Sequence, residues 1–152
     1  MTQAADLDAI REECRQRVRK RALVSAGAAV TPIPFLDVVV DAHILMELLP
    51  EISQRFGVDQ AGMARMDTEH KATAWRTIRQ RGSQLIGIVI TRQVVRKSFM
   101  GFAGRVAAMQ VAKFVPLGGQ LVAAALGYFV MREMAYQHID DCYAVASAVA
   151  AV

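Results

Sequence analysis

The chain has few aromatic side chains and few cysteines, and both shortages restrict its function. Aromatic residues make up 7% of its 152 residues, and none of them alternates with basic residues in a pattern that would stack nucleic-acid bases. No Cys-x-x-Cys motif occurs, and Cys14 and Cys142 lie near opposite ends of the sequence. We therefore predict two free thiols in a reducing compartment and consider nucleic acid an unlikely partner.

The sequence also lacks the motifs of common enzymes. It has no GxxxxGK[ST] string to hold nucleotide phosphates, and none of its serines lies in a nucleophile-elbow context. His43 and Glu47 lie one helical turn apart, as do His138 and Cys142, but zinc needs three or four converging ligands. We expect no catalysis, no metal and no cofactor.

Long charge-free runs are absent as well. The longest, residues 114–131, barely reaches the roughly 18–20 residues of a spanning helix and is broken by Pro116, Gly118 and Gly119. Residues 22–36 are also free of charge, but two prolines interrupt them. The N-terminal sequence MTQAADLDAIREE is polar and acidic, which does not resemble a signal peptide. We expect a cytoplasmic protein.

What the chain does contain is apolar residues at helical spacing. Hydrophobic residues account for 54% of the sequence, which is high for a small monomer with a fully hydrated surface. Their 3.6-residue periodicity predicts an all-α fold and a single domain, residues 1–152: a bundle of about five or six helices built around two Pro-cornered helical hairpins. The predicted helical segments are 2–30, 35–56, 63–81, 85–97, 99–115 and 119–141.

The two predicted hairpin corners share a pattern. Pro32 and Pro34 separate the apolar stretch 22–30 from the next helix, and Pro116, Gly118 and Gly119 separate two later apolar arms. Two interpretations remain open. The corners are either unrelated, or they belong to similar hairpins arranged around a pseudo-twofold axis.

Asp37 and Asp41 lie one helical turn apart, directly after the first corner. They could share a proton or bind a cation as a polar pair. The simpler interpretation is a helix start, where negative charge is favourable by about 0.3–1 kcal/mol. Within the helix 35–56 we place both on the polar arc, opposite an apolar face that includes Val38, Val39 and Leu45.

Basic residues gather directly before the first apolar stretch, in a chain whose net charge is +4. This order suits a helix that contacts anionic lipid, where each basic group contributes about 1 kcal/mol. Alternatively, the basic side chains pair with acidic neighbours. The cluster consists of Arg15, Arg17, Arg19, Lys20 and Arg21.

The stretch AGAAVTPIPFLDVVVDAHILMELLPEISQRFGV resembles the helical domain that follows the GTPase domain in bacterial YcjF-type proteins. The later stretch AKFVPLGGQLVAAALGYFVMREM resembles the same family and EcsC-like proteins. Together the two stretches cover roughly a third of the chain. Phe35 departs from the glycine that usually follows Pro-Ile-Pro in the family. The resemblance implies a stand-alone, membrane-associated helical domain without its GTPase, and it supplies no catalytic residues.

We therefore expect a non-catalytic helical module at the inner face of the membrane, either peripheral or shallowly inserted. Its expected partners are an anionic lipid surface, a further copy of the chain and a separate GTPase or other protein. The alternative is a homo-oligomeric or complex-forming interaction module with no membrane role. Binding of nucleic acid through Arg15–Arg21 and Arg76–Arg81 is the weakest of the hypotheses.

Overall fold

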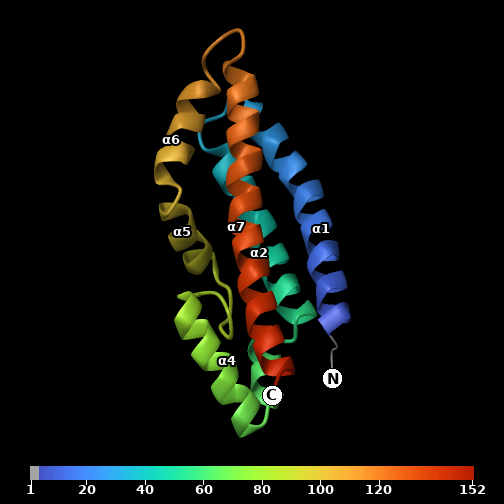
Figure 1. Cartoon of the computed structure of the whole chain (residues 1–152). Helices are drawn as coiled ribbons and strands as arrows, with labels where there is room; N and C mark the ends of the chain where they lie inside the picture. Colours follow the sequence, from blue (N-terminus) through green and yellow to red (C-terminus); the bar gives the residue numbers. More distant parts are fainter. Residues whose placement is uncertain (1–3) are drawn as a thin grey trace.

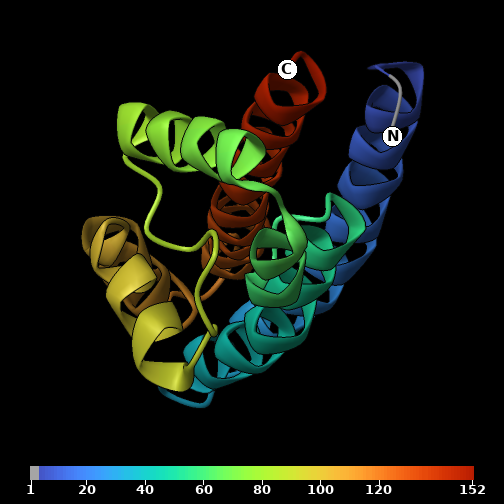
Figure 2. The same cartoon turned by 90° about the horizontal axis from the view of Figure 1, so that it is seen from below.

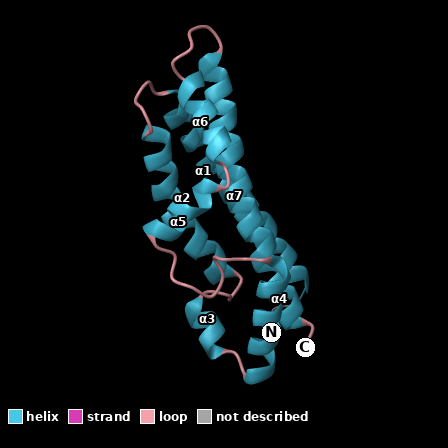
Figure 3. Cartoon of the chain, turned by 90° about the vertical axis from the view of Figure 1, so that its left-hand side faces the viewer, coloured by secondary structure: helices cyan, strands magenta, loops and turns pink. Residues whose placement is uncertain are grey.

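The computed structural model describes residues 4–152, and within this range every regular element is a helix (Figure 3). The all-α prediction is therefore confirmed. The sequence predicts that the first helix starts near Thr2 or Asp6; Thr2 lies outside the described residues, and Asp6 lies inside the observed helix. The helices are α1 (Ala4–Val30), α2 (Leu36–Arg55), α3 (Gln60–Arg65), α4 (Thr68–Arg81), α5 (Arg92–Met100), α6 (Ala103–Ala112) and α7 (Gly119–Ala150).

The long helix α7 is the centre of the molecule, and α1 is its most extensive neighbour (Figure 1). Helices α2, α4 and α6 also pack on α7, and α4 and α5 lie on the side of α7 away from α1 (Figure 2). The connections 31–35 and 113–118 lie at the same end of the bundle, whereas α3, α4 and the C-terminus lie at the other end (Figures 1 and 3).

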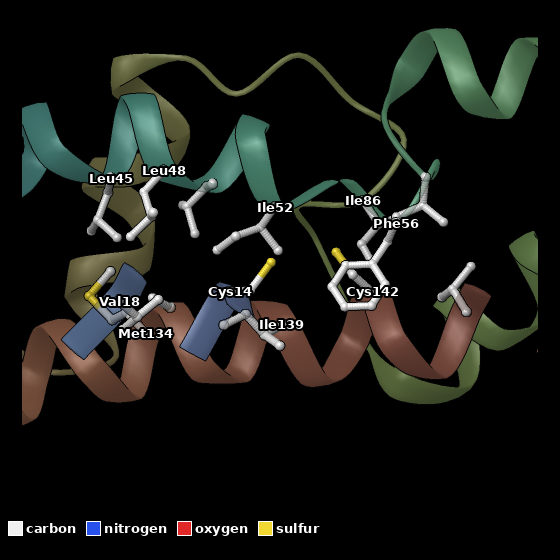
Figure 4. Close-up of a cluster of buried hydrophobic side chains, with 14 of the residues drawn as sticks. Cys14, Val18, Leu45, Leu48, Ile52, Phe56, Ile86, Met134, Ile139 and Cys142 are labelled. Carbon is white, nitrogen blue, oxygen red and sulfur yellow. The ribbon is translucent and has the colours of Figure 1, made fainter. Parts of the chain in front are cut away.

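The core forms where α1, α2 and α7 meet (Figure 4). Its side chains recur at spacings of three, four and seven residues, which place them on one face of each helix. Near the end that holds the two connections, small residues replace large ones, and α1 and α7 approach closely. A Cβ on Gly127 would lie 2.8 Å from the Cβ of Ala29. Buried core residues include Cys14, Val18, Leu45, Leu48, Ile52, Ile139 and Cys142.

Two predicted helices differ from the observed ones for local reasons. The predicted helix 63–81 is broken after Arg65, because the Asp67 carboxylate accepts the backbone N–H of His70 and starts α4 there. The segment 85–97 is helical only from Arg92, where the Thr91 hydroxyl caps α5. Before it, Gly87 adopts φ +75° close against the Trp75 ring, a conformation that favours glycine.

Further helix boundaries also differ from the predicted ones. Phe102 separates α5 from α6 within the predicted helix 99–115, and α7 continues to Ala150, beyond the predicted 141. Gly57 follows the end of α2 with φ +69°, the left-handed conformation in which many helices end and which favours glycine.

The buried face of α2 is rotated from the predicted one. Val39 is 66% exposed, whereas Asp37 and Asp41, which the sequence predicts on the polar arc, are buried. The physical reason is that Asp37 has a cationic partner on another helix, and this partner offsets the cost of removing the carboxylate from water.

Candidate functional site

The end of the bundle that carries both Pro-containing connections has an unusually apolar surface. We call this end the apolar tip and define it as residues 22–39 and 106–125. Its only charged residues are Asp37 and Lys113, and both are buried, so the tip exposes no charge. Among residues 4–152, most of the large hydrophobic side chains that are exposed lie here: Leu23, Val24, Ile33, Phe35, Val39, Val111, Phe114, Val115, Leu117, Leu121 and Val122.

Two of these exposed residues are held in a strained backbone conformation. Phe35 has φ +60° and Leu117 has φ +57°, in the left-handed region that costs a non-glycine residue roughly 1–2 kcal/mol. They are the only non-glycine residues with positive φ among residues 4–152. Phe35 is 58% exposed and Leu117 is fully exposed, so the strained residue of each connection holds its apolar side chain out into solvent.

The predicted corner residues lie in these two connections. Pro32 and Pro34 lie between α1 and α2, and Pro116 and Gly118 lie between α6 and α7; all four are exposed. Gly119 is buried at the start of α7, where an added Cβ would overlap the carbonyl oxygen of Ala112. Only glycine allows the chain to reverse so closely after α6.

A buried ion pair joins the two connections from inside. The Lys113 ammonium lies 2.7 Å from Asp37 Oδ1 and donates a second hydrogen bond, of 2.8 Å, to the carbonyl of Ile33. Gln110 donates to both carboxylate oxygens of Asp37, at 2.9 and 2.8 Å, and accepts the backbone N–H of Phe35 at 2.9 Å. The end of α6 is thus fastened to the 31–35 connection.

Asp41 lies one turn further along α2 and is only 1% exposed. Its Oδ1 has no hydrogen-bond partner. Burial raises the pKa of Asp41 to about 7; a side-chain hydrogen bond from Ser25 opposes this rise, and the negative charge of Asp37 adds to it. The predicted polar pair therefore consists of one carboxylate neutralised by Lys113 and a second that changes charge near neutral pH.

The predicted basic cluster on α1 is largely engaged in ion pairs. Arg15 contacts Asp140 at 3.0 Å, Arg17 contacts Glu51 at 2.7 Å, Arg19 contacts Glu12 at 3.0 Å and Arg21 contacts Glu47 at 3.8 Å. Lys20 is exposed and has no acidic partner among residues 4–152. Of the cluster, Lys20 and Arg21 lie nearest in sequence to the apolar tip.

A second polar group lies in the core, far from the tip. His138 Nε2 lies 2.8 Å from Ser53 Oγ and 3.2 Å from the Leu49 carbonyl, and Cys142 Sγ lies 3.6 Å away. Burial lowers the pKa of His138 to about 4 and raises the pKa of the Cys142 thiol, so both are neutral at pH 7. Within residues 4–152, no group of three His, Cys, Asp or Glu side chains could hold a metal ion.

The sequence contains one signal for the ion pair. Lys113 is the only charge in the stretch 106–131, and a lone charge in an apolar segment needs an opposite partner elsewhere. Asp37, which lies in a similar apolar stretch, is that partner.

No protein-family model matches the sequence, and neither a curated protein nor a solved structure matches it. Among residues 4–152, no helix is both long and apolar enough to cross a membrane.

Proposed function

We propose that the protein is a non-catalytic, membrane-associated helical module that inserts its apolar tip shallowly into an anionic lipid surface. The observation that carries this proposal is the pair Phe35 and Leu117. Each is large, apolar and exposed, and each is held at a positive φ that disfavours any residue except glycine. Contact with lipid would explain why the chain keeps two large apolar residues exposed in a strained backbone conformation.

The distribution of charge supports the same orientation. Exposed cations lie around the base of the tip: Arg21 directly precedes residue 22, and Arg105 directly precedes residue 106. The Arg105 guanidinium lies 4.6 Å from the centre of the Phe129 ring, and Arg132 lies 5.7 Å from it. Arginine beside aromatic rings is typical of side chains at the level of lipid headgroups. Anionic headgroups would therefore meet these positive charges as the tip enters.

The depth of the charge-free surface suits insertion without spanning. In α7 the residues from Gly119 to Met131 carry no charge, and at 1.5 Å per residue they extend about 20 Å. A hydrocarbon core is about 30 Å thick, so this length can enter the bilayer but cannot cross it.

The buried ion pair also favours this role. A tip that enters lipid cannot expose its charges, and in this chain Lys113 and Asp37 neutralise each other inside the tip. The same pair fixes the two connections relative to each other, so that Phe35 and Leu117 enter as one rigid unit.

Vesicle flotation at low salt tests the proposal. The protein should float with vesicles that contain phosphatidylglycerol and float less with vesicles of pure phosphatidylcholine. At 0.5 M salt it should detach partly, because screening weakens the attraction between the exposed cations and the anionic headgroups. Failure to bind phosphatidylglycerol vesicles would contradict it.

The competing function is a homo-oligomer that covers the same apolar tip with a second copy, since large apolar patches also mark protein interfaces. Light scattering in the absence of detergent and lipid separates the two. A stable dimer that dissociates when Leu117 is replaced by serine, and that binds no vesicles, would favour the oligomer.

A further inference from the structure

An apolar groove lies between α2 and α5, beside the apolar tip. It encloses a volume of about 530 Å³, within the usual range of small-molecule sites. Most of its wall is hydrocarbon, and its polar groups are Arg92 and Arg96 on α5 and His43 on α2. The lining residues are Val38, Val39, Val40, Ala42, His43, Met46, Arg92, Arg96 and Phe99.

The charge of the groove is positive and unbalanced. Arg92 and Arg96 lie one turn apart on α5, both are exposed, and neither has an acidic partner among residues 4–152. This differs from α1, where four arginines of the basic cluster pair with carboxylates. Three acidic residues lie in or beside the α2 wall: Asp37 and Asp41 are buried, and Glu47 contacts Arg21 at 3.8 Å and His43 at 3.5 Å.

The groove also has a direction. Helix α2 leads away from the tip, whereas α5 leads through α6 towards it (Figure 1). Val39, which is 66% exposed, belongs both to the tip and to the groove. Arg92 begins α5 and therefore lies at the end of the groove further from the tip. Val38 and Val39 belong to the tip and are apolar, so the groove is apolar where it adjoins the tip.

We propose that the groove holds one acyl chain of an anionic phospholipid, with the lipid phosphate against Arg92 and Arg96. This inference rests on the proposed function, because the lipid comes from the leaflet that the tip enters, and it names the lipid class that the module selects. The chain would lie along Val39 and Phe99, parallel to the chains of the surrounding leaflet. Two guanidinium groups one turn apart can hold a phosphate by several charge-assisted hydrogen bonds. In phosphatidylcholine the headgroup's own choline cation already offsets part of the phosphate charge.

Binding of a soluble lipid tests the groove without a membrane. The probes are dioctanoyl phosphatidylglycerol and dioctanoyl phosphatidylcholine, each below its micelle-forming concentration, titrated calorimetrically into the full chain. We expect the wild type to bind the anionic lipid at least tenfold more tightly than the zwitterionic one. The Arg92→Gln/Arg96→Gln variant should lose that preference, and Ala42→Phe, which fills the groove, should weaken both lipids.

Matched variants make each outcome informative. Arg76→Gln/Arg79→Gln removes two exposed charges from α4, away from the groove, and should bind as the wild type does. Phe35→Gly/Leu117→Gly should keep binding of the soluble lipid while it loses vesicle binding. If the wild type binds neither soluble lipid, or if Arg92→Gln/Arg96→Gln retains the preference, the groove proposal is overturned. The proposed membrane function fails separately, if the wild type does not float with anionic vesicles.

Discussion

The Lys113 ammonium and the Asp37 carboxylate lie 2.7 Å apart, and both side chains are completely buried. They are the only charged residues of the apolar tip, and because both are buried the tip exposes no charge. Their hydrogen bonds to Gln110 and Ile33 satisfy the buried groups and connect α6 to the 31–35 connection. The pair therefore keeps charge away from the tip surface and holds the two connections together.

Removing only one member of this ion pair should destabilise the folded state. Replacement of Lys113 by Met leaves the Asp37 carboxylate buried and unpaired, and should lower the free energy of unfolding by about 3–5 kcal/mol. Replacement of both residues, Asp37→Leu with Lys113→Met, removes the uncompensated charge and should recover most of that loss. Urea unfolding measures both variants. A single variant as stable as the wild type would contradict the assigned burial.

Asp41 should make stability depend on pH in an unusual direction. Its pKa is raised from 3.8 to about 7 in the folded state, so between these values the folded chain holds more protons than the unfolded one. Stability from this group is therefore present at low pH and is lost as the pH rises from about 4 to 7. Asp41→Asn should be more stable than the wild type at pH 8, by roughly 2–4 kcal/mol, with little difference at pH 4. Unfolding curves at both pH values test this.

His138 should change stability with pH in the opposite direction, over part of the same pH range. Its pKa is lowered from 6.5 to about 4, so the unfolded state holds more protons between these values. Stability from this group is present above pH 6.5 and is lost as the pH falls towards 4. In the wild type the two effects offset each other between pH 4 and 6.5. Without the opposing effect of Asp41, the Asp41→Asn variant should lose stability on acidification through His138. The His138→Gln variant should instead gain stability on acidification. Parallel pH profiles for the two variants would refute this account.

Two glycines provide a matched test of the close approach between α1 and α7. Gly127→Ala places a Cβ 2.8 Å from the Cβ of Ala29 and 3.3 Å from Met109 Sδ, and should destabilise the fold by about 1–3 kcal/mol. Gly27→Ala adds a Cβ with nothing within 4 Å, inside α1, and should stabilise it by about 0.5–1 kcal/mol. Thermal unfolding should shift in opposite directions. Equal shifts would mean that the helices are not so tightly packed there.

Periodicity predicted the all-helical fold and the start of α7 at Gly119, because long amphipathic segments and a Pro-Gly-Gly break are strong local signals. It did not predict the non-helical segment before Thr91, where Gly87 against Trp75 and a side-chain cap override an apolar, helix-like pattern. It also placed Asp37 and Asp41 on the polar arc of α2. The burial of Asp37 depends on Lys113, which is 76 residues away in sequence, and a helical wheel contains no information on such a partner.

The central claim is that Phe35 and Leu117 are held in strained, exposed positions because they contact lipid. Phe35→Gly/Leu117→Gly relieves the strain, so the variant should unfold at the same urea concentration as the wild type or at a higher one. Val89→Gly removes an exposed apolar side chain outside the tip and serves as the control. The direct measurement is flotation of the three proteins with phosphatidylglycerol vesicles. We predict that the wild type and Val89→Gly float and that the folded double variant remains at the bottom of the gradient. Flotation of the double variant to the same extent as the wild type would contradict the claim.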